Sequence, residues 1–338
     1  MGRRPRNKKR AKITKIEPRG TPEGGLKYYY WGILFLVVLF TAFVRVRLIS
    51  IPLERDEGEF AYMGQLILQG IPPSLISYNM KLPGIYSAYA LIMAIFGQSA
   101  EGIHLGFIIV NAATIFLVFL LGKHLYDSYT GIIASAAFAV LSVSPSVLGT
   151  SAHATHFVLL PALGGIFLML KAINSGKWKN LFWSGILSGM SFMMKQPGVF
   201  FIIFAFLYLI FNLERRHDIP FQTLLKQGAL FLFGSILPFV LALGILYMVG
   251  VSEKFWFWTY LYAKEYASKV PFSMGLEIFL SQVRHIVDQF YLLWAIGGVG
   301  ICTFLWNKTA RTRAPFVLGF FVFSFLGVCP GLYFREHY

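Results

Sequence analysis

Long apolar segments separated by short polar ones run through most of the sequence. Nine of them predict membrane-crossing helices, at residues 29–48, 103–122, 131–149, 156–173, 180–195, 197–213, 227–250, 288–306 and 315–333. A helix needs about 20 apolar residues to cross the hydrocarbon core of a bilayer. The segments come close to or exceed that length, and they are too long and continuous for the strands of a membrane barrel. The pattern therefore predicts an all-α polytopic membrane protein.

Composition agrees with this class, and the distribution of charge argues against a nucleic-acid partner. Hydrophobic residues make up 57% of the chain and charged residues only 13%, against about 25% charged in a soluble domain. The net charge is +15, but ten Lys/Arg fall in the first 27 residues, directly before the first apolar segment. That placement is typical of a cytoplasmic flank that orients the first helix and contacts anionic lipids. We therefore expect residues 1–28 to be a basic cytoplasmic tail before an uncleaved anchor.

The loop charges predict the topology of the single transmembrane domain, residues 29–338. With the N-terminus inside, the inner loops carry Lys123, Lys171, Lys177, Lys179, Arg215, Arg216, Lys226, Lys308, Arg311 and Arg313. The short outer turns near 150–156 and 195–198 carry only Lys195. This is the expected excess of positive charge in inner loops. Two longer outer loops follow from it, 49–102 and 251–287.

Each outer loop contains an unusual segment. Residues 83–96 are apolar but short for a full span, and counting them as one would place the later basic loops outside. We therefore expect an interfacial or re-entrant helix there. The second loop contains the aromatic-rich run 255–260, which equally fits a position at the bilayer interface or packing within the loop.

Three carboxylates lie within four residues just after the first span, at Asp56, Glu57 and Glu59. Apolar positions at helical spacing predict a short amphipathic helix over 56–69. Asp56 as N-cap and Glu59 as the N3 residue would form a capping box, with Glu57 favoured by the helix dipole. Capping alone explains the pattern. A helix terminus at the membrane surface would also hold a catalytic carboxylate rigidly, so both readings stay open.

Basic side chains and histidines of the outer turns add further candidates. Lys81 and Lys195 can each pair with a lipid phosphate, or serve only as anchors at the headgroups. His153 and His156 share a face if that turn is helical, which could suit a metal ion. Two histidines alone are a weak pattern, so we predict no metal site; a divalent ion stays possible without support from a ligand pattern. The sequence contains no P-loop and no G-x-G-x-x-G turn, so an outer-face transferase would need a membrane-embedded donor.

In this order the motifs resemble the GT-C superfamily, and most closely its group of protein O-mannosyltransferases and the bacterial lipid A aminoarabinose transferase. The resemblance covers roughly residues 29–213 and rests on Asp56-Glu57, the helix 60–69, Lys81-Leu82-Pro83, the short outer turn after the third span, and 192–196 (Phe-Met-Met-Lys-Gln). The ending Glu336-His337-Tyr338 resembles a motif beside a later family helix. We expect the full protein to continue beyond it.

The resemblance implies a GT-C-like transmembrane helix bundle with interfacial helices in the first outer loop. It implies an integral membrane hexosyl- or pentosyltransferase of the bacterial plasma membrane, using a polyprenyl-phosphate sugar on the outer face with inversion. The acceptor hydroxyl could belong to a lipid, a glycan or a protein. Asp56 then maps onto the catalytic base or acceptor-orienting residue, with Glu57 beside it, and Lys81 onto a contact to the donor phosphate.

The sequence departs from the family pattern at three points. Leu82-Pro83 stands where relatives carry a Pro-Pro pair, which is a small difference. His156 falls where relatives carry a second acidic residue in the short outer turn, and Glu59 falls where a basic residue is usual. The candidate substrate-binding residues are Glu59, Tyr62, Lys81, His153, His156, Lys195 and Gln196. A base for the acceptor proton and cations for the leaving phosphate would complete the chemistry.

Two other functions compete with the transferase. A lipid or solute transporter favours charges at mid-membrane and paired broken helices, whereas the charges here gather in a loop. A non-catalytic scaffold subunit would tolerate replacement of all three acidic loop residues.

Overall fold

A computed structural model describes residues 27–215 and 219–334, which contain helices and no strand. Six helices are long and apolar enough to cross a membrane: α1 Lys27–Arg47, α5 Ala100–Leu125, α7 Ala154–Ser175, α9 Val199–Glu214 with the preceding 3₁₀ turn η2 Gln196–Gly198, α10 Phe221–Met248 and α15 Lys308–Val328. The expected all-α polytopic membrane fold is confirmed. The basic tail before residue 27 lies outside the described residues.

Further helices complete the bundle without settling the number of spans. α6 Ser128–Leu141 and α8 Trp178–Met194 run along their longer neighbours, but have only 14 and 17 residues. α13 Phe272–Gln289 and α14 Tyr291–Cys302, extended by the 3₁₀ turn η4 Thr303–Leu305, form a pair bent by 102°, which could count as a seventh span. Nine spans therefore stay a prediction.

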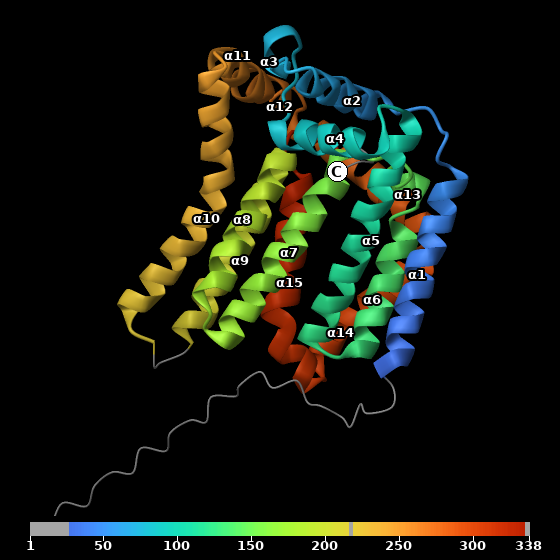
Figure 1. Cartoon of the computed structure of the whole chain (residues 1–338). Helices are drawn as coiled ribbons and strands as arrows, with labels where there is room; N and C mark the ends of the chain where they lie inside the picture. Colours follow the sequence, from blue (N-terminus) through green and yellow to red (C-terminus); the bar gives the residue numbers. More distant parts are fainter. Residues whose placement is uncertain (1–26, 216–218, 335–338) are drawn as a thin grey trace, which may run out of the picture.

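The segment predicted as the first outer loop, residues 49–102, contains three helices that lie across one end of the bundle (Figure 1). They are α2 Arg55–Leu68, α3 Pro73–Ile76 and α4 Pro83–Phe96. α2 presents Phe60 and Met63 to a buried cluster that includes Tyr89 of α4. Gly64 makes the close approach possible, because a Cβ there would lie 2.9 Å from the backbone nitrogen of Ala90.

Small residues bring the central helices into close contact. Gly165 of α7 faces α8, where a Cβ on it would lie 2.6 Å from Ser188 Oγ. Ser184 Oγ donates a 2.7 Å hydrogen bond to the carbonyl of the same glycine. Small and hydroxyl-bearing residues are the usual means of packing helices within a bilayer, where the hydrophobic effect between helices is weak.

The first part of the segment predicted as the second outer loop reaches the same end of the bundle as α2 and α3 (Figure 1). It contains α11 Ser252–Trp256, the π-helical segment η3 Phe257–Tyr262 and α12 Ala263–Ala267. Lys254 donates a 3.0 Å hydrogen bond to the carbonyl of Leu75 in α3, and the rings of Trp258 and Tyr78 lie 5.1 Å apart. The two outer loops therefore form one structure over the end of the bundle.

Candidate active site

The start of α2 differs from the sequence expectation. α2 begins at Arg55 and its N-cap is Glu54, whose Oε2 accepts a 2.7 Å hydrogen bond from the amide of Asp56. Glu57 completes the capping box, because its Oε2 accepts from the Glu54 amide at 2.8 Å. The prediction that Asp56 is the cap and Glu59 the N3 residue was wrong. The earlier start leaves the Asp56 carboxylate out of the cap.

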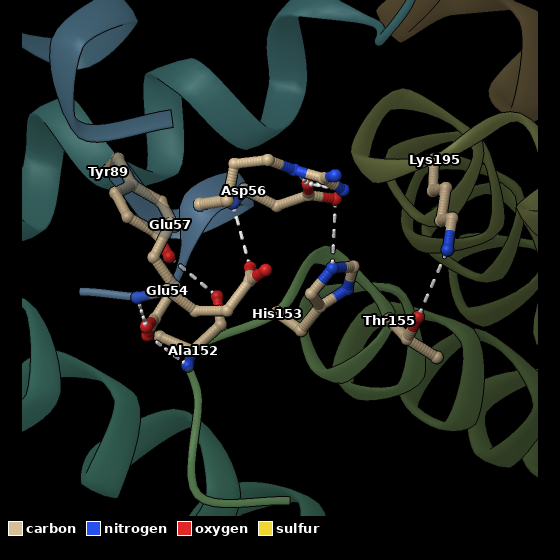
Figure 2. A network of polar contacts seen from close by, with 9 residues as sticks. Glu54, Asp56, Glu57, Tyr89, Ala152, His153, Thr155 and Lys195 are labelled. Atoms are coloured by element: carbon tan, nitrogen blue, oxygen red, sulfur yellow. Dashed lines mark hydrogen bonds and ion pairs between the residues drawn. The ribbon is translucent and has the colours of Figure 1, made fainter. Parts of the chain in front are cut away.

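The Asp56 carboxylate instead forms a pair with His153 (Figure 2). Asp56 Oδ2 lies 3.1 Å from His153 Nε2, and Oδ1 accepts hydrogen bonds of 3.1 and 2.8 Å from the Arg55 guanidinium. Burial alone would raise the pKa of Asp56. The hydrogen bonds from His153 and Arg55, aided by the charge of Lys81, outweigh it and hold this pKa well below its usual range. Asp56 is therefore ionised at neutral pH.

His153 is the N-cap residue of α7, and only 1% of its surface is exposed. Burial lowers its pKa below the ordinary value, against the opposing effect of Asp56. A neutral imidazole can donate from one ring nitrogen only. The contact with an ionised carboxylate assigns that proton to Nε2.

Glu57 fixes the turn that carries His153. The amide of Ala152 donates to Glu57 Oε1, which also lies 3.3 Å from His104 Nε2 in α5. The hydroxyl of Tyr89 donates a 2.6 Å hydrogen bond to the carbonyl of Ala152. Both oxygens of the Glu57 carboxylate are thus engaged, and the residue is 1% exposed. This geometry favours a positioning role for Glu57 over direct contact with a substrate.

Two lysines, Lys81 and Lys195, lie close enough to Asp56 for their charges to interact with it. Lys195, between α8 and η2, is 3% exposed, and its Nζ lies 3.3 Å from Thr155 Oγ1. Burial, reinforced by the charge of Lys81, lowers the pKa of Lys195 well below its ordinary value. The next residue, Gln196, donates to the carbonyl of Met80, which ties this turn to the segment carrying Lys81. An anion bound beside Lys195 would raise the pKa of this lysine.

A polar cavity of about 320 Å³ lies beside Asp56 and Lys81, but neither His153 nor Lys195 lines it. Its lining combines charged residues of α2, the segment before α4 and aromatic residues of the second outer loop: Arg55, Asp56, Glu59, Tyr78, Asn79, Met80, Lys81, Trp258, Tyr262 and Tyr266. Its volume lies at the lower end of the roughly 300–1,000 Å³ usual for small-molecule sites. The pKa of Glu59 is raised, because it is half-buried and lies near Asp56.

The remaining sequence candidates lie outside this cavity. Tyr62 is on the exposed face of α2, and the His156 ring packs on Phe107, with centroids 4.8 Å apart. Sequence reasoning had noticed the aromatic run of the second outer loop but did not assign Trp258, Tyr262 or Tyr266 to the site. The four-residue spacing of these three residues was the available signal.

Within the described residues, one group of side chains could hold a metal ion. Ligand atoms of Glu54, Asp56 and His153 all lie within 4.8 Å of one another. Two carboxylates and an imidazole suit several divalent ions. However, Glu54 already accepts the Asp56 amide, and Asp56 is bonded to His153 beside the positive Arg55. An ion would have to break these contacts, and the reaction proposed below does not use one.

This geometry predicts that chelation leaves activity intact. Treating the purified protein with EDTA should change turnover by less than about twofold, because hydrogen bonds within the protein already orient Asp56. Turnover is measured before chelation, after it, and after Mn²⁺ or Zn²⁺ is added back. Loss with EDTA and recovery with either ion would instead show that the Glu54, Asp56 and His153 group is a working metal site.

Comparison with known proteins identifies the family. The family model described as dolichyl-phosphate-mannose-protein mannosyltransferase matches residues 81–248. The matched segment includes Lys81, His153 and Lys195 and begins after Asp56, so the case for Asp56 rests on the contacts described above. No curated protein matches the chain. The chain belongs to the dolichyl-phosphate-mannose-protein mannosyltransferase family and is a multi-pass membrane glycosyltransferase of the GT-C type.

Proposed function

We propose that the protein transfers a sugar from a polyprenyl phosphate to an acceptor hydroxyl, with inversion at the anomeric carbon. The observation that carries this proposal is an ionised, buried carboxylate that lines one cavity together with a lysine. Asp56 supplies the negative group and Lys81 the positive one. Displacement of a phosphate by a hydroxyl needs these two charges at opposite ends of the reacting bonds.

An apolar groove beside the polar cavity supports a lipid-borne donor. It measures about 330 Å³ and lies between α4, α10 and the α2–α3 turn, with Ile71, Pro83 and Leu246 among its lining residues. A narrow cavity of about 40 Å³ shares Pro83 and Leu246 with the groove, and Lys81 and Trp258 with the polar cavity. An isoprenoid tail in the groove would therefore bring its phosphate to Lys81 and its sugar toward Asp56.

The reaction follows from that placement. The acceptor oxygen attacks the anomeric carbon from the side opposite the phosphate, which forms a glycosidic bond and inverts the centre. The bond between the anomeric carbon and the phosphate oxygen breaks, and its electron pair leaves with the polyprenyl phosphate. Lys81, with Lys195 behind it, stabilises that negative charge. Asp56 accepts a hydrogen bond from the acceptor hydroxyl and takes up its proton as the new bond forms.

The arrangement of basic loops supports an active site on the outer face with a cytoplasmic N-terminus. α2, α3 and α4 lie at one end of the bundle, and the starts of α8 and α15 lie at the other. Lys177 directly precedes α8, and Lys308 is the first residue of α15. Nucleotide sugars in the cytoplasm cannot reach an active site on the outer face. A lipid-linked sugar donor therefore suits a site in that position. Labelling of a cysteine introduced at exposed Tyr78 by a membrane-impermeant reagent in intact cells tests this orientation, and labelling only after lysis would contradict it.

Replacing Lys81 by Met should weaken donor binding. We expect at least a tenfold higher Kd for undecaprenyl phosphate, because a desolvated contact between cation and phosphate is worth more than about 1.4 kcal/mol. The Kd of the acceptor should change far less. Binding is measured on the full chain in lipid nanodiscs.

Lys264→Met is the matched control for this experiment. Lys264 lies in α12 at the same end of the bundle and is exposed, but it does not line the polar cavity. Equal weakening in both variants would contradict a specific phosphate contact at Lys81. Binding of the glycosylated lipid by the wild type without transfer to any acceptor would favour a transporter instead.

A further inference from the structure

Three aromatic residues of the second outer loop form one wall of the polar cavity. Trp258, Tyr262 and Tyr266 share the lining with Asp56 and Lys81, although the two groups lie almost 200 positions apart in the sequence. We call Trp258, Tyr262 and Tyr266 the aromatic wall. Nothing in the reaction described above uses them.

The local helix geometry aligns the wall. Residues four apart in an α-helix rotate by about 40° at each step, because a turn contains 3.6 residues. Residues 257–262 are π-helical, with more residues per turn, so the step from Trp258 to Tyr262 rotates in the opposite sense. The following α-helical step to Tyr266 restores the direction. All three side chains therefore face the cavity, and π-helical segments occur frequently at functional sites.

Contacts from three directions hold the wall in place. The Trp258 ring lies 5.1 Å from that of Tyr78 and 5.3 Å from that of Tyr262. Tyr266 stacks on Tyr333 at 4.8 Å, and the Tyr333 hydroxyl donates a 3.2 Å hydrogen bond to the Tyr266 carbonyl. Phe255, at the start of the segment, is 5% exposed and belongs to the same buried cluster as Leu82. The wall is thus fixed relative to Lys81.

We propose that the aromatic wall binds a pyranose ring, with the ring's C–H face stacked on Trp258. This inference rests on the proposed glycosyl transfer and names how the sugar is held. A pyranose presents C–H groups on a face and hydroxyls at its rim. The negative face of an aromatic ring attracts such C–H groups, while Arg55, Glu59 and Asn79 of the same cavity offer charged and polar partners to the rim.

A position in the bilayer interface explains only part of this aromatic run. Trp256 and Tyr260 stack on each other at 4.8 Å and are each 51% exposed. Neither lines the cavity. They are the residues that fit an interfacial belt. Trp258 is less exposed than Trp256 and Tyr260, and it lines a cavity that also contains charged residues. A residue that serves only to anchor the protein at the bilayer interface has no role there.

Binding measurements on the full chain in nanodiscs test the wall. The probes are undecaprenyl phosphate, the same lipid carrying mannose or glucose, and a soluble mannotriose. Trp258→Ala should raise the Kd of a pyranose-bearing probe about tenfold, as truncation of a central Trp commonly does. The Kd of the sugar-free lipid should stay within twofold. Trp258→Phe should recover most of the loss, and Trp256→Ala should bind every probe as the wild type does.

The pattern of losses identifies the source of the sugar. A loss confined to the lipid-linked sugars assigns the wall to the donor, and a loss confined to mannotriose assigns it to a glycan acceptor. Three outcomes would overturn the inference. Trp258→Ala could weaken the binding of all probes equally, or Trp256→Ala could have the same effect as Trp258→Ala. The wild type could also bind the lipid with the same Kd whether or not it carries a sugar. Failure of the wild type to bind the sugar-free lipid would instead count against the proposed donor.

Discussion

Asp56→Asn is expected to reduce transfer by at least a hundredfold while the protein still inserts into the membrane. Removal of a positioned proton acceptor commonly costs about 10²–10⁴ in rate. Asparagine keeps the size of the side chain and can still meet His153, so the packing around α2 should survive. Transfer is measured as label moved from the polyprenyl-phosphate sugar to acceptor, normalised to the amount of protein in purified membranes.

The low pKa of Asp56 defines its role more narrowly. The hydrogen bonds from His153 and Arg55 that outweigh burial also make the carboxylate a weak base. Such a group accepts a hydrogen bond from the acceptor hydroxyl throughout the reaction and receives its proton late, when the new bond makes that proton acidic. Because the folded pKa lies below the unfolded value, the stability that Asp56 contributes is complete at neutral pH. It is lost only as pH falls through the folded pKa.

The low pKa of Asp56 determines the expected pH profile of the enzyme. Wild-type kcat/KM should show no fall from Asp56 between about pH 5 and 8, because the carboxylate is ionised throughout. His153→Ala removes the strongest of the contacts that lower this pKa. The pKa of Asp56 should therefore rise in this variant, and the acidic limb of its kcat/KM profile should move to higher pH. An unchanged limb in that variant would mean that His153 does not control Asp56.

The matched control for Asp56→Asn is Asp127→Asn. Asp127 caps α6 with a 2.7 Å hydrogen bond to the amide of Thr130, at the other end of the bundle. Asparagine caps helices as well as aspartate does. Near-normal turnover in Asp56→Asn, or an equal loss in both variants, would remove Asp56 from the catalytic step.

The sequence predicted much of the local structure around this site. The apolar positions Phe60 and Met63 gave α2 and its buried face. The start of α2 was misplaced because two capping boxes overlap, Glu54 with Glu57 and Asp56 with Glu59. The first one forms since Glu57 also binds the amide of Ala152, a contact between residues 95 positions apart. Such a contact leaves no trace in the spacing of nearby residues.

The same limit applies to the assembly of the site. Topology placed Asp56 and His153 at one membrane surface, but their hydrogen bond joins residues 97 positions apart. The position of Trp258 beside Tyr78 depends on how two outer loops pack together. The spacing of Trp258, Tyr262 and Tyr266 is visible in the sequence. The helix or loop that these side chains face is not. Periodicity therefore predicted the elements, and tertiary packing decided which side chains meet. The side of the membrane stays a prediction.

A second large effect is expected from Arg45, which sequence reasoning did not single out. It lies near the end of α1 and is 5% exposed. Its guanidinium donates 2.7 Å hydrogen bonds to the carbonyls of Ser142 and Gly149, and lies 4.2 Å from the centroid of the Phe107 ring. These carbonyls belong to the segment between α6 and α7 that ends at His153. Arg45 thus holds the His153 turn against α1 and α5.

Arg45→Met should therefore lower both stability and activity. Leaving two buried carbonyls without a donor costs about 1–3 kcal/mol each, which corresponds to a fall in Tm of several degrees, roughly 5 °C or more. Turnover should fall more than stability predicts, because the His153 turn loses its support. Arg45→Lys should recover only part of either loss, since an ammonium cannot reproduce the two-pronged geometry of a guanidinium.

Arg47→Met distinguishes this effect from a general loss of positive charge at the end of α1. Arg47 lies in the same last turn but is exposed, so its replacement should change Tm by less than about 1 °C. If Arg45→Met lowers Tm but the remaining folded enzyme turns over normally, Arg45 stabilises the bundle without positioning His153. If Arg45→Met and Arg47→Met change Tm and turnover equally, the hydrogen bonds from Arg45 to the two carbonyls do not explain the effect. A fall in turnover at temperatures well below the Tm of Arg45→Met, absent in Arg47→Met, would establish that α1 controls the geometry of the Asp56–His153 pair.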